Sequence, residues 1–413
     1  MAIIEVEELT KIFNGDIRAV DGISFKVEEG ELLGFLGPNG AGKTTTLNML
    51  STLLKPTSGS AIVNGHDILE NPDAVRRSIG FVFQDPTLDT ELTGRENLDF
   101  HGRIYGLKRK VRVERIKEML EIVQLEDRAD DLVKTYSGGM KRRLEIARGL
   151  LHYPKVLFLD EPTLGLDPQT RRAIWEHIQR LNEDEKVTII LTTHYTEEAD
   201  YLCNRIQIID FGKLVAVGTP NDLKSRLEGD IVSLVFKDPA HLMKIHPLFK
   251  GKDWVSSAIP VAGDGGNAGG MSRMMEIMRR IARGRGGMGG MGGLAGMGAG
   301  GGHGGGGIRI PKRYKEMIAK AMSSKGGLSA MMKAGAKQLN LLVDDGGHRI
   351  PEIVKIVDGA GVELESVELH KPTLDDVFLA TTGRSIRDER GSFTETIRRR
   401  RITRSARGMR VRG

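Results

Sequence analysis

The feature that most constrains the fold of this chain is a glycine loop between a buried strand and a helix. Residues 32–36 are a continuous apolar run, the pattern of a strand buried on both faces. Residues 37–44 follow at once and match G-x-x-x-x-G-K-[ST], and the next segment, TTTLNMLSTLL, has the period of a helix. Strand, glycine loop and helix in this order predict a phosphate-binding loop, or P-loop.

The loop residues have the chemistry that a nucleoside triphosphate requires. Glycines let successive backbone N–H groups point at the phosphates, Lys43 can neutralise the β- and γ-phosphates, and the Thr44 hydroxyl can ligate Mg²⁺. The helix from Thr45 adds the positive end of its dipole. We therefore expect ATP and Mg²⁺ as cofactors, with the nucleotide contacted by Gly37, Asn39, Gly40, Ala41, Gly42, Lys43, Thr44 and Thr45.

A second apolar strand ends in two carboxylates. Residues 156–159 are followed by Asp160 and Glu161. Such a strand end is common when it stands alone, but beside a P-loop it has a specific meaning. Asp160 can hold Mg²⁺ through water, and Glu161 can polarise an attacking water as general base.

A second anion-binding segment precedes another helix. Ser137, Gly138 and Gly139 offer a hydroxyl and exposed backbone N–H groups at a helix start. One ATP needs only one P-loop, so this second segment requires an anion of its own.

Ser-Gly-Gly before a basic helix resembles the signature motif of ABC-transporter ATPases, which implies contact with the ATP held by the other protomer. Met140 and Tyr136 replace the commoner Gln and Leu, as in exporters of the drug-resistance type. The resemblance implies four further positions, all at family-like spacing. These are Gln84 as sensor of Mg²⁺ and the γ-phosphate, Asp167 at the dimer seam, His194 as the switch histidine on the γ-phosphate, and Phe13, where Tyr is usual, stacked on adenine.

The predicted fold class is α/β: a P-loop NTPase core of the ABC ATPase type with antiparallel β and helical subdomains, plus a small C-terminal α+β domain. Residues 3–8 and 23–27 alternate in polarity like strands, residues 85–150 have helical periods, and residues 156–191 form a β-α-β unit. The expected domains are 1–226, the ATPase; 227–383, the accessory domain, interrupted by a Gly/Met-rich, disordered insert at 263–335; and 384–413, an Arg-rich tail. Residues 372–379 resemble the C-terminal motif of the daunorubicin-resistance branch.

The composition of the chain indicates where in the cell the protein is expected. No run of about 18 apolar residues predicts a membrane span, no signal peptide is predicted, and the single Cys203 fits a reducing cytosol. The tail holds eleven Arg and three acidic residues, a charge of +8, whereas the rest of the chain sums to −2. We expect a cytoplasmic protein, peripheral on the inner face of the cell membrane, whose tail can contact anionic lipid. The tail could also bind nucleic acid non-specifically. It has no Tyr or Trp and so lacks the stacking residues of a single-strand binder, and nucleic acid is disfavoured as a partner.

These features together predict a homodimer that sandwiches two ATP and powers a separate integral membrane permease docked at residues 85–150. The C-terminal motif favours export of a drug-like or other amphiphilic compound, although cargo contacts belong to the other chain. The alternative is a soluble ABC ATPase acting on nucleic acid or ribosomes, which the single cassette and lack of heptads disfavour. A catalytically inactive scaffold is disfavoured because Lys43, Asp160, Glu161 and His194 are all present.

Overall fold

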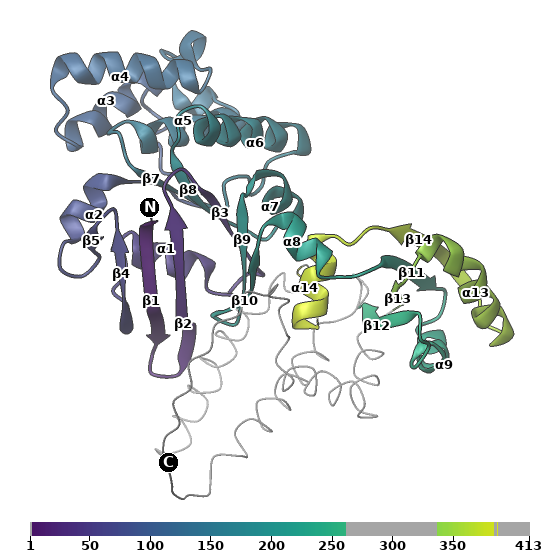
Figure 1. Cartoon of the computed structure of the whole chain (residues 1–413). Helices are drawn as coiled ribbons and strands as arrows, with labels where there is room; N and C mark the ends of the chain where they lie inside the picture. Colours follow the sequence, from purple (N-terminus) through teal and green to yellow (C-terminus); the bar gives the residue numbers. More distant parts are fainter. Residues whose placement is uncertain (1, 262–336, 384–385, 387–413) are drawn as a thin grey trace, which may run out of the picture. The chain divides into compact units, whose positions relative to one another are not determined.

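The computed structural model describes residues 2–261, 337–383 and 386, which fall into two compact units, residues 2–223 and the residues from 224 on (Figure 1). The insert predicted at 263–335 and, apart from Ile386, the tail lie outside the described residues. The domain limits read from the sequence stay predictions. No helix in the described part of the chain combines the length and the apolar character that crossing a bilayer requires.

A six-stranded sheet organises the first unit, and it confirms the predicted parallel sheet. Its strand order is β10-β9-β3-β8-β7-β6, and every neighbouring pair except β9–β10 is parallel. Since parallel strands end at the same edge, the segments after β3, β6, β7 and β8 meet there. The strands are β3 (Leu32–Leu36), β6 (Ile79–Val82), β7 (Val156–Asp160), β8 (Thr188–Thr193), β9 (Arg205–Asp210) and β10 (Lys213–Gly218).

A four-stranded antiparallel sheet, of order β2-β1-β4-β5, shares a core with the first sheet. Ile4, Leu9, Phe35 and Phe158 are fully buried in that core, together with Leu47 of α1 (Lys43–Leu50). Helix α1 is therefore fixed by apolar packing immediately after the glycine loop. The strands of this sheet are β1 (Ala2–Phe13), β2 (Ile17–Glu28), β4 (Ser58–Val63) and β5 (His66–Asp67).

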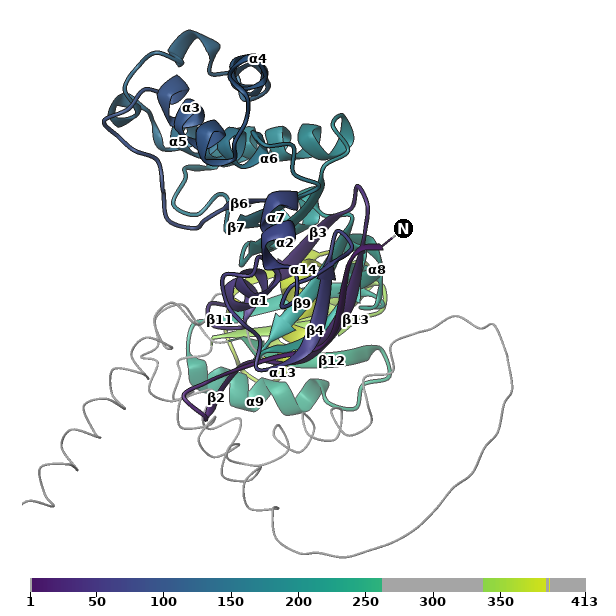
Figure 2. The same ribbon diagram turned by 90° about the vertical axis from the view of Figure 1, so that its left-hand side faces the viewer.

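The predicted helical region forms a group of its own. Helices α3 (Gly94–Ile104), α4 (Arg109–Ile122) and α5 (Gly138–Leu150) lie together, away from the antiparallel sheet, in both views (Figures 1 and 2). Helix α3 begins with a capping box in which Thr93 and Glu96 satisfy each other's backbone N–H groups. The remaining helices are α2 (Pro72–Ser78), α6 (Pro168–Glu183), α7 (Thr196–Leu202) and α8 (Pro220–Ser225), with short 3₁₀ turns at Glu126–Arg128 and Val133–Thr135.

The second unit is the predicted small α+β domain. Its antiparallel sheet has the order β12-β13-β11-β14, and helices α9 and α13 bury Val232, Leu234 and Phe236 on one face. Val261 pairs with Gln338, so the chain leaves this sheet and re-enters it at neighbouring positions. The elements are β11 (Asp230–Phe236), α9 (Pro239–Phe249), β12 (Val255–Val261), β13 (Gln338–Val343), α13 (Gly346–Gly359), β14 (Leu364–His370) and α14 (Leu374–Thr382).

Candidate functional site

The glycine loop passes too close to other backbone for any side chain at two of its positions. A Cβ on Gly37 would lie 2.2 Å from Ile209 O, and one on Gly42 would lie 2.4 Å from Ala19 O. Gly42 also has a φ of 112°, which L residues rarely adopt, and it caps the N-terminus of α1. Asn39 and Gly40 are exposed, whereas Ala41 is buried and Thr45 is half-buried. The loop therefore presents backbone amides at a helix start, the arrangement that binds phosphate.

Lys43 is the buried cation of this loop, with only 4% of its surface exposed. Its Nζ donates to Gly37 O at 2.8 Å and Pro38 O at 3.1 Å, and lies 3.4 Å from Glu161 Oε1. Burial lowers the pKa of the ammonium, and the carboxylates of Glu161 and Asp160 oppose that shift. Because both carbonyls are neutral, the ammonium remains well placed to attract a more highly charged anion.

Asp160 ends β7 beside the P-loop threonine. Its Oδ1 accepts a hydrogen bond from Thr44 Oγ1 at 3.0 Å and another from Thr192 Oγ1 at 2.5 Å. Burial raises the pKa of the carboxyl, while the two hydroxyl donors lower it in part. A carboxylate and a hydroxyl at this distance are a donor set that suits Mg²⁺.

Glu161 takes a left-handed backbone conformation, with a φ of 45°, directly after the strand. Its N–H donates to Thr192 O at 3.1 Å, and its Oε1 lies 3.2 Å from His194 Nδ1 as well as near Lys43. Burial raises the pKa of the carboxyl, but the contacts with His194 and Lys43 outweigh it, and the pKa is lowered overall. The structure thus brings an ionised carboxylate between a lysine and a histidine, in a backbone conformation that is uncommon for non-glycine residues.

The signature motif and the predicted seam residue Asp167 lie at two helix starts. Ser137 caps α5 by accepting from Met140 N at 3.3 Å, and Asp167 caps α6 by accepting from Thr170 N at 2.9 Å. A Cβ on Gly139 would lie 2.4 Å from Thr170 Cγ2, so the two helix starts pack closely; Gly138 beside it is exposed. Among the described residues, no hydrogen bond or ion pair joins these caps to Lys43 or Glu161.

Two other predicted residues are not joined to the lysine and carboxylate cluster. Gln84 is exposed just after β6 and makes no hydrogen bond within the described part of the chain. Phe13 ends β1, is 36% exposed, and its ring centroid lies 5.3 Å from Lys11 Nζ. Their roles remain predictions.

The sequence reading missed two supporting side chains. Thr192 fixes both carboxylate residues, through its hydroxyl to Asp160 and to the Glu161 N–H. Glu198 is fully buried and accepts from Thr163 Oγ1 at 2.7 Å and Trp175 Nε1 at 2.9 Å. The only sequence signal for Thr192 is its place in a pair of threonines at the end of a strand, just before His194. No sequence pattern indicates a role for Glu198.

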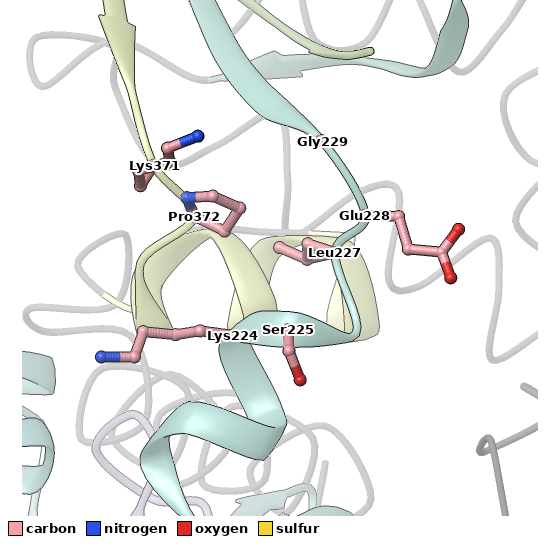
Figure 3. Close-up of a pocket in the computed structure, with 7 residues that line it drawn as sticks. All are labelled: Lys224, Ser225, Leu227, Glu228, Gly229, Lys371 and Pro372. Carbon is pink, nitrogen blue, oxygen red and sulfur yellow. The ribbon is translucent and has the colours of Figure 1, made fainter. Parts of the chain in front are cut away.

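A shallow open pocket lies in the second unit, where Leu227 and Pro372 face each other (Figure 3). Lys371 beside it is already paired with Asp230 Oδ1 at 2.7 Å. The motif at 372–379 has a local structural meaning, because Thr373 and Asp376 form a capping box that starts α14. We assign no ligand to this pocket.

The fold and the site define a P-loop nucleotide-binding protein, and comparisons with known proteins agree. The profile of the ABC transporter family matches residues 20–164. The daunorubicin/doxorubicin resistance ATP-binding protein DrrA of Streptomyces peucetius is 47% identical over 235 residues, which are 57% of this chain and 71% of the relative. The doxorubicin resistance ATP-binding protein DrrA of Mycobacterium tuberculosis is 35% identical over 368 residues, 89% of each chain.

A solved structure extends this likeness. CbiO1 of Clostridium perfringens, described as part of an ABC transporter complex, superposes with a TM-score of 0.52 at 30% identity, over 54% of this chain and 91% of that one. The chain therefore belongs to the ABC transporter family, in the branch of ATP-binding proteins that includes DrrA. It is an ATPase subunit, as the sequence predicted.

Proposed function

We propose that this chain is the motor of an exporter: it dimerises around two ATP and drives a separate membrane permease that expels a drug-like or other amphiphilic compound. The names of the relatives, which describe resistance to daunorubicin and doxorubicin, support a cargo of that kind. The observation that carries the proposal is the ion pair between Lys43 and Glu161 at 3.4 Å, beside a glycine loop that ends at the N-terminus of α1.

The triphosphate enters this site by replacing contacts that Lys43 makes with its own chain. The γ-phosphate then takes the place of the carbonyls of Gly37 and Pro38 as the partner of the ammonium. Mg²⁺, held by Thr44 and Asp160 with Gln84 as a further ligand, would neutralise charge on the β- and γ-phosphates. Thr192 keeps Asp160 oriented for that purpose.

Glu161 acts as the general base. Its lowered pKa keeps it ionised at neutral pH, so it can take a proton from water as the water oxygen forms a bond to the γ-phosphorus and the bond to ADP breaks. His194, 3.2 Å from the same oxygen, orients the carboxylate and is near enough to reach the γ-phosphate.

The two anion-binding segments serve different nucleotides. Ser137 and Gly138 are exposed at the start of α5, and the described contacts of Ser137 do not include the P-loop of the same chain. We assign them to the ATP bound by the partner protomer, with Asp167 at the seam between the two chains. ATP then bridges two protomers, and its hydrolysis removes that bridge.

Exposed apolar side chains on the helical group support a docking surface for the permease. Phe100 and Ile104 of α3 and Val111 and Val113 of α4 are all exposed. Such side chains cluster where a protein meets a partner. A permease at this surface would hold the motor at the inner face of the membrane, and the Arg-rich tail adds attraction to anionic lipid.

The test is to isolate the protein gently from native membranes and identify what is released with it by detergent. Co-purification with a multi-span membrane protein supports the transporter motor, and the identity of that protein narrows the cargo. Recovery only in the soluble fraction with RNA or ribosomal proteins would contradict the proposal and favour the alternative ATPase.

A further inference from the structure

Helix α5 carries three charged side chains that are almost completely buried. Arg142, Glu145 and Arg148 follow one another at intervals of three residues and are 6%, 1% and 6% exposed. Residues three apart lie on the same side of a helix, so the three charges face the same neighbour. Charged residues are almost never this buried unless they are paired, and the partners of these three identify what the helix face does.

The three side chains hold one short segment, residues 83–87, on both sides of Gln84. Arg142 Nη1 donates to Phe83 O at 2.6 Å. Glu145 Oε1 accepts from Thr87 N at 2.8 Å, while Arg148 Nη1 donates to Thr87 O at 2.9 Å. The position of Gln84 is therefore determined by α5 rather than by contacts of its own.

Arg142 also contacts the strand end that carries the catalytic carboxylates. Its Nη2 donates to Asp160 O at 3.1 Å, its Nε donates to Pro162 O at 2.7 Å, and Glu145 Oε2 lies 3.0 Å from Nη1. A guanidinium is planar and rigid, so these bonds fix the distance between the two segments. One side chain thus links the backbone before Gln84 to the backbone on either side of Glu161.

We propose that Arg142, supported by Glu145 and Arg148, is a positioning residue that holds Gln84 against the hydrolytic end of β7 and couples this site to the start of α5. This inference rests on the proposed function, in which the start of α5 contacts the ATP of the partner protomer. Engagement of that ATP then reaches the chain's own carboxylates through the hydrogen bonds of Arg142 to Asp160 O and Pro162 O, and reaches Gln84 through its bond to Phe83 O. Buried ion pairs contribute little net stability, so a role in geometry explains the three charges better than a role in folding.

The neighbouring Arg143 provides a matched control. It is on the same helix and also donates to backbone carbonyls, but to Val123 O at 3.0 Å and Gln124 O at 3.3 Å. It makes no contact with residues 83–87 or 160–162 within the described part of the chain. Arg143→Lys therefore makes the same chemical change outside the linked segments.

The experiment compares Arg142→Lys with Arg143→Lys in the full chain, measuring kcat and KM for MgATP and the Kd of a fluorescent ATP analogue. Lysine keeps the charge, but its three donors lie on a single nitrogen and cannot reproduce the planar fork of the guanidinium. We expect Arg142→Lys to lower kcat by about tenfold or more with Kd within about twofold, because misplacement of a catalytic group by about 1 Å has effects of that order. Arg143→Lys leaves kcat within about twofold.

A second measurement separates positioning from general damage. If Arg142 acts through Gln84, the effects of the two substitutions on kcat should not add, because the residues are coupled. The kcat of the double variant Gln84→Ala/Arg142→Lys should then be within about twofold of the kcat of Gln84→Ala alone. Should Arg142→Lys fail to fold, Glu145→Gln carries the same test, because it removes the charge and keeps an oxygen for Thr87 N.

Two results would overturn the inference. One is an equal kcat for the Arg142→Lys and Arg143→Lys chains. The other is that Arg142→Lys lowers kcat in the Gln84→Ala chain by as large a factor as it does in the wild type. Both presuppose a wild-type chain that hydrolyses ATP. A wild-type chain that binds no ATP and hydrolyses none would contradict the proposed function instead, so the two failures are distinguishable.

Discussion

At the scale of single residues, Lys43 is held by groups that a phosphate would replace. Its ammonium is buried, donates to two carbonyls of its own loop and lies 3.4 Å from Glu161. Burial of an ammonium is unfavourable, and it lowers the pKa of this one. Binding a polyanion relieves that cost, so affinity for nucleotide depends on this charge.

Lys43→Ala should weaken the binding of ATP by about 10- to 100-fold, the range expected for the loss of one or two charge-assisted hydrogen bonds. Isothermal titration calorimetry of the full chain with MgATP measures the effect. Lys117→Ala, which removes an exposed lysine of α4 that is not part of the site, is the control and should leave affinity unchanged within about threefold. Undiminished affinity in the Lys43→Ala chain would remove the basis for the P-loop assignment.

His177 makes stability depend on pH. It is buried in α6, and burial lowers its pKa from 6.5 to about 4, with smaller effects from Arg180 and Arg143. Between those values the unfolded chain binds a proton that the folded chain does not, so stability is fully present above pH 6.5 and falls as the pH drops towards 4.

Lowering the pH from 7.5 to 5 should therefore reduce the free energy of unfolding by roughly 2 kcal/mol through His177 alone. Urea unfolding of the wild type and of His177→Leu at both pH values isolates this contribution. The variant should show a correspondingly smaller difference between the two pH values, whereas His66→Gln, a partly exposed histidine of the same unit, should not. An identical pH dependence in wild type and His177→Leu would contradict the assignment.

At the scale of elements, the segments with regular patterns were predictable and those defined by distant partners were not. The apolar run of β3, the turn at residues 14–16 and the β-α-β unit were predicted and are present, since each depends on local sequence. Strand β1 ends at Phe13 and strand β2 begins at Ile17, so both are longer than predicted. Bulges keep the two strands paired even where their polarity does not alternate regularly.

The buried face of α5 shows the limit of the sequence reading. The segment KRRLEIAR has the polarity of an exposed helix face, and the packing of residues 83–87 and 160–162 against it buries its charges. The left-handed conformation of Glu161 has the same origin, since Thr192 on another strand holds its N–H. The P-loop and carboxylates were accessible from sequence because their chemistry is local; their supports come from residues far along the chain.

The hairpin formed by β12 and β13 supports an element-scale prediction. Val261 and Gln338 are paired, so a short Asn-Gly turn can replace residues 262–337 without moving either strand. Shortening the loop reduces the entropy lost on closing it, which should raise the free energy of unfolding by on the order of 2 kcal/mol. Urea unfolding measures the change, and a shortened chain that no longer unfolds cooperatively would show that the removed segment is needed to hold the sheet.

At the scale of the whole molecule, the site is divided between two places on the chain. Lys43, Glu161 and His194 are linked by short contacts, whereas Ser137 and Asp167 cap other helices and have no described contact with them. In the proposed dimer, a second copy of the chain completes the nucleotide site. Dimerisation should therefore depend on ATP and on both sets of residues.

Glu161→Gln keeps the shape of the side chain and removes its basicity, so ATP should bind without being consumed and hold two chains together. Light scattering should give a dimer with MgATP and a monomer with MgADP, and ATP hydrolysis should fall by at least about 100-fold.

Adding Gly138→Asp to the Glu161→Gln chain places a negative charge at the exposed start of α5, where a Cβ would lie 3.3 Å from Leu166 Cδ2. This double variant should bind ATP as tightly as Glu161→Gln alone yet remain monomeric, because the P-loop is intact and only the partner's contact is repelled. Dimers that persist with Gly138→Asp, or a loss of ATP binding by the monomer, would mean that the signature residues act on the ATP of their own chain.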